Sequence, residues 1–110
     1  MKLPNGHLAI LDVNKLEQYC LSLTHPRGRH KARLFAASLG ISTAQIETLR
    51  KALVTAATDG DATLVRKNKF GDLYRVDFEM AGPHGPKRVQ SAWIVLENEQ
   101  IPRFVTCYPV

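Results

Sequence analysis

The chain has 110 residues and a formal net charge of +5, and 45% of its residues are hydrophobic. This length suits one domain that folds without disulfides or metal, and the charge favours acidic partners such as nucleic acid or an acidic protein. The sequence excludes a membrane-spanning helix and a cysteine–histidine zinc site, because it has neither a long apolar run nor metal-type spacing.

The first half of the chain is predicted to be helical after a brief strand at 8–11. Apolar residues then recur with a period near 3.6, which is typical of amphipathic helices. Asp12 is a good N-cap, Gly40 suits the position after a helix end, and residues 42–45 (STAQ) form a capping-box pattern. The predicted helices cover residues 13–23, 29–39 and 43–57.

The second half is predicted to be a sheet, because the hydrophobic period changes to 2 after Asp61. The end of the segment 88–96 is apolar on both faces, which indicates a central strand. The predicted strands cover 62–67, 73–80, 87–96 and 103–108, and their short connections favour antiparallel pairing. The sequence thus predicts a single α+β domain over residues 1–110. Its helical half, 12–58, contributes three N-terminal helices packed on the four-stranded antiparallel sheet of the sheet half, 62–109, which keeps one face open for a ligand.

The segment 25–35 carries the strongest functional signal. Arg29, His30 and Lys31 lie in the predicted first turn of the second helix, where cations oppose the helix dipole. Such departures from local rules tend to occur where function requires them. Arg27 and Arg29 suit phosphate binding, and His30 suits proton transfer. The alternative is a solvated basic helix surface.

The last predicted strand, 103–108, is the second candidate segment. Simple alternation places Phe104, Thr106 and Tyr108 on one face. The hydroxyl groups of Thr106 and Tyr108, with Ser91 on the neighbouring strand, can hydrogen-bond a phosphate. The alternative is an ordinary strand, since threonine and tyrosine are both common in strands.

Three other residues have structural interpretations. Cys20 and Cys107 are expected to be free, buried thiols in a reducing compartment, and a nucleophilic pair of Cys107 with His30 has no support in the sequence. His25, which precedes a proline, is expected to pack within its loop. The carboxylates are scattered, so no metal site and no cofactor are expected.

Both candidate segments resemble those of one bacterial family. The stretch 28–35 (GRHKARLF), followed by 39–41 (LGI), resembles a signature of C-terminal toxin domains in bacterial polymorphic toxins. The stretches 91–95 (SAWIV) and 102–108 (PRFVTCY) resemble the paired closing strands of the same group. Essentially the whole chain resembles a family of small bacterial proteins that is itself similar to the barnase–EndoU–colicin–RelE-like (BECR) ribonuclease superfamily.

The resemblance implies a metal-independent endoribonuclease toxin. It would cleave RNA, either tRNA or mRNA, by attack of a 2′-hydroxyl on the adjacent phosphate. The implied catalytic residues are His30, Lys31, Ser91, Thr106 and Tyr108, and the implied substrate-binding residues are Arg27, Arg29 and Arg103. The expected partners are RNA and an acidic antitoxin or immunity protein, in the cytoplasm of a producing or target bacterium. Two alternatives stay open: a non-catalytic basic module that binds nucleic acid or protein, and the antitoxin or immunity half of such a pair.

Overall fold

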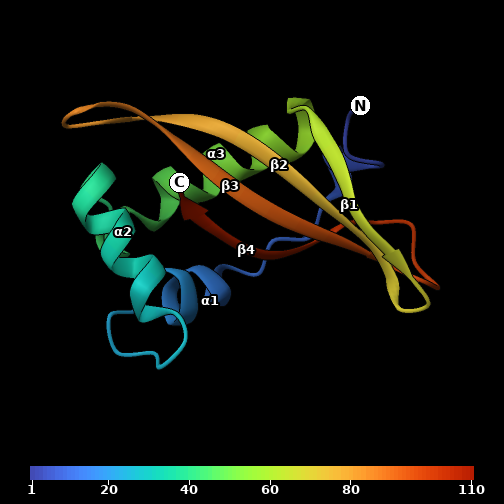
Figure 1. Ribbon diagram of the computed structural model, residues 1–110, viewed down its shortest axis with the longest axis horizontal. Helices are drawn as coiled ribbons and strands as arrows, with labels where there is room; N and C mark the ends of the chain where they lie inside the picture. Colours follow the sequence, from blue (N-terminus) through green and yellow to red (C-terminus); the bar gives the residue numbers. More distant parts are fainter.

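In the computed structural model, which describes residues 1–110, helical segments precede a four-stranded antiparallel sheet (Figure 1). The predicted α+β class and the strand order along the chain are therefore confirmed. None of the helices combines the length and apolar character needed to cross a bilayer. The helical segments are η1 (Gly6–Leu8), α1 (Val13–Lys15), the π-helix η2 (Leu16–Cys20), α2 (Arg29–Leu39), η3 (Thr43–Gln45) and α3 (Ile46–Asp59). The strands are β1 (Ala62–Asn68), β2 (Gly71–Gly82), β3 (Gly85–Leu96) and β4 (Arg103–Pro109).

Local signals fix the ends of α2 and α3. Gly40 adopts φ 65° after α2, a left-handed conformation that glycine adopts at low cost. Ser42 and Gln45 form the predicted capping box, because the Ser42 backbone amide donates to Gln45 Oε1 at 2.8 Å and the Ser42 side chain accepts from the helix backbone. As a result, α2 has the predicted bounds, and the third helical segment begins where its cap predicts.

The predicted helix at 13–23 is shorter and partly of another type. Asp12 caps it as expected, since its carboxylate accepts from the backbone amide of Asn14 at 2.9 Å. After a single α-turn the chain widens into the π-helix η2, and the Leu21 amide donates to the Leu16 carbonyl at 2.8 Å. Ser22 Oγ then accepts from the next loop amides, so a side chain competes with helix continuation.

The brief strand predicted at 8–11 is also different in the structure. The 3-10 turn η1 includes Leu8, and only Ile10 pairs with the sheet, through an isolated parallel bridge to Arg103. The Ile10 amide donates to Pro102 O at 2.9 Å, and its carbonyl accepts from Phe104 N at 2.9 Å. Pairing with the sheet is limited to Ile10, because the residues just before it form the 3-10 turn η1 and do not run along the sheet.

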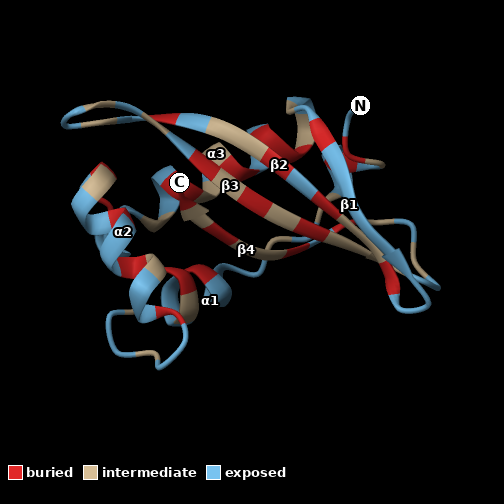
Figure 2. Cartoon of the chain, viewed as in Figure 1, coloured by how far each residue is buried: buried red, intermediate tan, exposed pale blue.

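The sheet has the order β1-β2-β3-β4, so β3 is central as predicted. In Figure 1, α3 passes behind the sheet, whereas α1 and α2 lie beside β4. Buried and more exposed residues alternate along β2 and β3 (Figure 2), because one face of each strand meets α3 and the other does not. Among the core residues, Val76, Val89 and Trp93 are all 0% exposed.

A β-bulge changes the predicted alternation in β4. Ala92 pairs with Thr106 but Trp93 pairs with Phe104, which leaves Val105 as the extra residue. Phe104 and Cys107 are therefore both buried in the core. Thr106 and its alternate neighbour Tyr108 face the side that α3 leaves open. The prediction that Phe104 shares their face is wrong, because simple alternation does not anticipate a bulge.

Candidate functional site

Lys31 projects from the first turn of α2 and lies against two tyrosines. Its Nζ donates a hydrogen bond to Tyr19 Oη at 3.2 Å and lies 5.0 Å from the centroid of that ring. The same Nζ lies 5.7 Å from the centroid of the Tyr108 ring. Lys31 is half-buried and forms no salt bridge. Aromatic faces attract a cation but do not neutralise it, so this ammonium is suited to bind an anion.

Each tyrosine hydroxyl of this cluster accepts a hydrogen bond from a neighbour. Lys31 donates to Tyr19, and Gln90 Nε2 donates to Tyr108 Oη at 3.0 Å. A phenol also has one hydrogen to donate, and neither hydroxyl donates it to a protein acceptor. The hydroxyl hydrogens of both tyrosines and the remaining hydrogens of the Lys31 ammonium thus have no protein acceptor. We call Tyr19, Lys31, Gln90 and Tyr108 the anion cluster.

Gly28 and His25 position the anion cluster through the backbone. A Cβ on Gly28 would lie 2.1 Å from the carbonyl oxygen of Tyr19, so glycine is required for α2 to approach η2 this closely. His25 Nδ1 accepts from the amides of Arg27 and Gly28, both at 3.0 Å, which satisfies donors at the start of α2. The His25 ring meets the Tyr19 ring edge-on at a centroid distance of 4.8 Å. His25 therefore packs within its loop and orients Tyr19.

Polar side chains continue from Tyr108 across the open face of the sheet. The strand register places Gln90 opposite Tyr108, and Asp77 opposite Gln90. Thr106 and Arg75 belong to the next row, and Arg75 Nε lies 3.5 Å from Asp77 Oδ1. An extended ligand held at the anion cluster can therefore follow these two rows across the sheet.

The structure brings together two of the predicted catalytic residues, Lys31 and Tyr108. Thr106 lies two residues from Tyr108 on the same strand, is half-buried, and has its Oγ1 3.9 Å from Cys20 Sγ. His30 is adjacent to Lys31 in the chain, but its side chain is exposed and makes no hydrogen bond within the protein. His30 is thus open to solvent at the first turn of α2.

The predicted substrate-binding residues are divided between two places. Arg27 and Arg29 are exposed at the start of α2, and neither forms an ion pair. Arg103 begins β4, at the opposite end of that strand from Tyr108, and its Nε lies 2.8 Å from Glu99 Oε2. Arg103 therefore lies outside the anion cluster, with its charge balanced by a carboxylate.

Ser91 points into the core rather than toward the open face. It is 1% exposed, and its Oγ donates to the Val76 carbonyl at 2.6 Å. The same oxygen accepts a hydrogen bond from Trp93 Nε1 at 3.0 Å. Both of its hydrogen bonds thus connect core residues, and a ligand on the open face meets the neighbouring Gln90 instead.

Sequence reasoning did not identify Tyr19 or Gln90 as site residues. Tyr19 fits the apolar period of the predicted helix 13–23, and that pattern does not distinguish a core residue from a site residue. Gln90 is one polar residue in a predicted strand where polar and apolar residues alternate. Their contacts with Lys31 and Tyr108 join segments far apart in the chain, and no local pattern contains that information.

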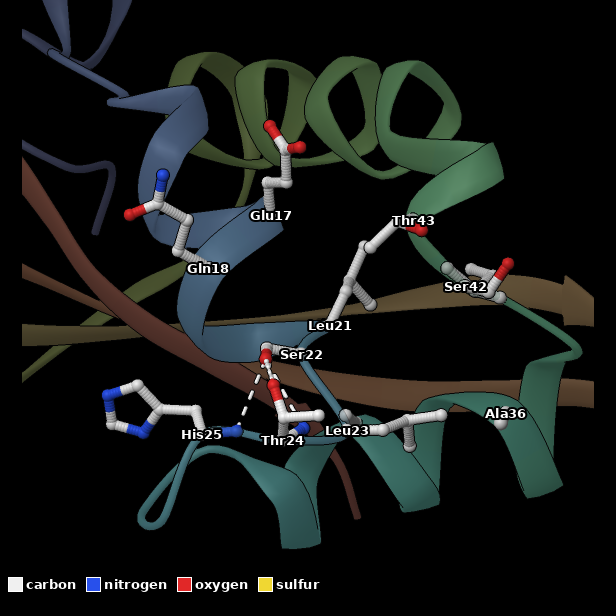
Figure 3. Close-up of a pocket in the computed structure, with 12 residues that line it drawn as sticks. Glu17, Gln18, Leu21, Ser22, Leu23, Thr24, His25, Ala36, Ser42 and Thr43 are labelled. Carbon is white, nitrogen blue, oxygen red and sulfur yellow. Dashed lines mark hydrogen bonds between the residues drawn. The ribbon is translucent and has the colours of Figure 1, made fainter.

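The largest hollow, of about 540 Å³, lies between η2, the loop after it, α2 and the start of η3 (Figure 3). It is lined by Glu17, Gln18, the loop 21–25, Ala32, Ala36 and residues 41–43. Glu17 is its one acidic side chain, and no lysine or arginine lines it, so it suits an anion less well than the anion cluster. Nowhere in the structure do three or more His, Cys, Asp or Glu side chains come together to hold a metal ion.

Comparison with known proteins finds similarity to a solved structure and to a protein family. The fold is similar to that of a chain in a contact-dependent growth inhibition toxin–immunity protein complex from Klebsiella pneumoniae 342. That chain has a TM-score of 0.70 and 16% sequence identity, and the match covers 92% of this chain and 99% of that chain. No curated protein matches the sequence. Residues 2–110 match the family described as a domain of unknown function, DUF6883, and the chain belongs to that family.

Proposed function

We propose that this chain is a toxin domain that binds RNA at the anion cluster and cleaves it. The observation that carries the proposal is the half-buried Lys31 ammonium, which has two aromatic rings and a neutral hydroxyl as neighbours but no carboxylate. A phosphate of RNA supplies the missing negative charge. The free hydroxyl hydrogens of Tyr19 and Tyr108 supply further hydrogen bonds to its oxygens.

In the proposed reaction, the ribose 2′-oxygen attacks the adjacent phosphorus and the bond from phosphorus to the 5′-oxygen breaks. The products are a 2′,3′-cyclic phosphate and a 5′-hydroxyl. Lys31, Tyr19 and Tyr108 stabilise the negative charge that grows on the phosphate oxygens. His30, exposed beside Lys31 in the first turn of α2, accepts the proton of the 2′-hydroxyl or returns one to the leaving oxygen.

Residues around the anion cluster are proposed to hold the rest of the RNA. Arg27 and Arg29 are exposed and free of ion pairs, so they bind flanking phosphates. Thr106 lies on the same strand as Tyr108 and donates to a phosphate or sugar oxygen. Ser91 and Arg103 take no part in this arrangement, because one is buried and the other is paired with Glu99.

The toxin role, rather than the immunity role, is favoured by charge. The chain carries a net charge of +5, which suits a polyanionic substrate. An immunity protein that covers this site would be acidic, because it must replace the phosphate that Lys31 binds. The similar fold in a toxin–immunity protein complex supports a protein partner of the toxin or immunity kind.

Expression of the chain in bacterial cells tests the proposed function. We expect the parent to arrest growth and to generate new RNA ends, and Lys31→Met to do neither while accumulating as folded protein. The wild-type genetic neighbour of this chain, expressed from a second plasmid, should restore growth. Normal growth with abundant parental protein, together with protection of cells against the neighbour's product, would instead identify this chain as the immunity half.

A further inference from the structure

Two buried cysteines lie directly beneath the anion cluster. Cys20 is the last residue of η2, and Cys107 lies on β4; both are 0% exposed and free. Cys20 Sγ lies 3.9 Å from the Oγ1 of Thr106, the residue before Cys107 on β4, and each thiol is near enough to shift the pKa of the other. The two thiols therefore lie close together where η2 packs on β4. Their chain neighbours are Tyr19 and Tyr108, the two tyrosines that flank Lys31.

We propose that Cys20 and Cys107 are a redox site, whose reversible disulfide joins η2 to β4 beneath the anion cluster. The sequence interpretation of two inert structural thiols does not require them to meet, since they come from opposite ends of the chain. The structure places them close together where η2 packs on β4, and each belongs to an element that carries one tyrosine of the site. A disulfide here would fix the spacing of those two elements.

The pKa values of the two thiols indicate which of them reacts first. The hydrogen bond from the Cys107 side chain lowers the pKa of Cys20 to about 7, whereas the interaction with Cys20, together with burial, raises the pKa of Cys107. Near neutral pH, Cys20 is therefore the thiolate that attacks, and Cys107 is the thiol that resolves. The charge of Lys31 also lowers both pKa values, as a smaller effect.

The oxidant is a small-molecule disulfide such as oxidised glutathione. The Cys20 thiolate attacks one of its sulfurs, which forms a mixed disulfide and releases one glutathione. Cys107 then loses its proton and attacks the Cys20 sulfur, which releases the second glutathione. The two protein thiols lose two protons and two electrons in total, and oxidised glutathione is reduced to two glutathione molecules.

Access to Cys20 requires η2 to open. This part of the chain consists of one α-turn and one π-turn, and Val13, Asn14, Lys15, Glu17 and Gln18 are all exposed. Short helical segments with exposed backbone hydrogen bonds open at lower free energy than the core of a domain. The reaction is therefore expected to be slow, because it needs local opening of η2, but to proceed without global unfolding.

The test is incubation of the purified full chain in glutathione redox buffers, followed by intact mass analysis and counting of free thiols with maleimide. We expect the parent to lose both free thiols and two hydrogens in mass, as a monomer. Because the bond closes a loop that spans most of the chain, we expect its melting temperature to rise by about 10–20 °C. Dithiothreitol should reverse both changes.

Cys20→Ser and Cys107→Ala are the matched controls, each of which leaves one thiol. If both fold, Cys107→Ala should accept one glutathione at Cys20, and Cys20→Ser should stay largely unmodified. Should either variant fail to fold, the parent alone decides. Retention of two free thiols, accumulation of glutathione adducts without an internal disulfide, or disulfide-linked dimers would each overturn the proposal. None of these readouts needs RNA, so the result is independent of the proposed function.

Discussion

Lys31→Met is expected to lower the rate of RNA cleavage by about 10²–10³-fold, the usual effect of removing one group that stabilises transition-state charge. Methionine keeps an unbranched apolar chain between the rings of Tyr19 and Tyr108, and its sulfur makes favourable contacts with aromatic rings. The variant therefore loses the charge but keeps the packing. Cleavage of a labelled RNA oligonucleotide under single-turnover conditions measures the change, with circular dichroism to confirm the fold.

Lys51→Met is the matched control for this experiment. Lys51 is exposed on α3, far in the fold from the open face of the sheet, and forms no ion pair. Lys51→Met lowers the net charge of the protein by one, as Lys31→Met does. Its cleavage rate therefore reports the effect of overall charge alone. Equal losses in the two variants would mean that Lys31 acts only through net charge and not as part of a site.

Ser91→Ala is expected to affect stability rather than chemistry. The change removes one oxygen that accepts from Trp93 Nε1 and donates to Val76 O, which leaves two buried polar groups without that partner. Such groups cost about 1–3 kcal/mol each. We expect the free energy of unfolding to fall by about 2 kcal/mol and the melting temperature to fall by about 10 °C.

Urea unfolding measures this loss, and the cleavage rate per folded molecule of Ser91→Ala should stay close to that of the parent. Ser38→Ala is a suitable control, because Ser38 is half-buried on α2 and its hydroxyl makes no hydrogen bond. A Ser91→Ala variant with parental stability but no cleavage activity would show that Ser91 acts on the substrate, contrary to its position in the core.

The parts of the fold that the sequence predicts are those with local causes. The bounds of α2 follow from loop-forming residues before it and from Gly40 after it. The strands follow from the hydrophobic period of 2. That pattern is kept because one face of the sheet is covered by α3 and the other is not. The π-turn in η2 and the bulge at Val105 are different, because each accommodates packing between distant segments. Neither has a pattern of its own in the sequence.

The same distinction applies to the candidate site. Lys31 and Tyr108 stand out by residue type and context, and the structure places them together. Tyr19 and Gln90 complete the anion cluster through tertiary contacts that the sequence does not contain. Ser91 is a polar residue in an apolar strand, and its sequence context is the same whether its hydroxyl meets a substrate or Trp93.

RNA-end analysis after incubation of the purified parent with total bacterial RNA, in the presence of a chelator, tests directly whether the chain is a metal-independent ribonuclease. We expect new 5′-hydroxyl ends and 2′,3′-cyclic phosphate ends with the parent, and neither with Lys31→Met. RNA that stays intact with folded parental protein under every buffer condition, or equal cleavage by parent and Lys31→Met, would contradict the assignment of the anion cluster as a ribonuclease site.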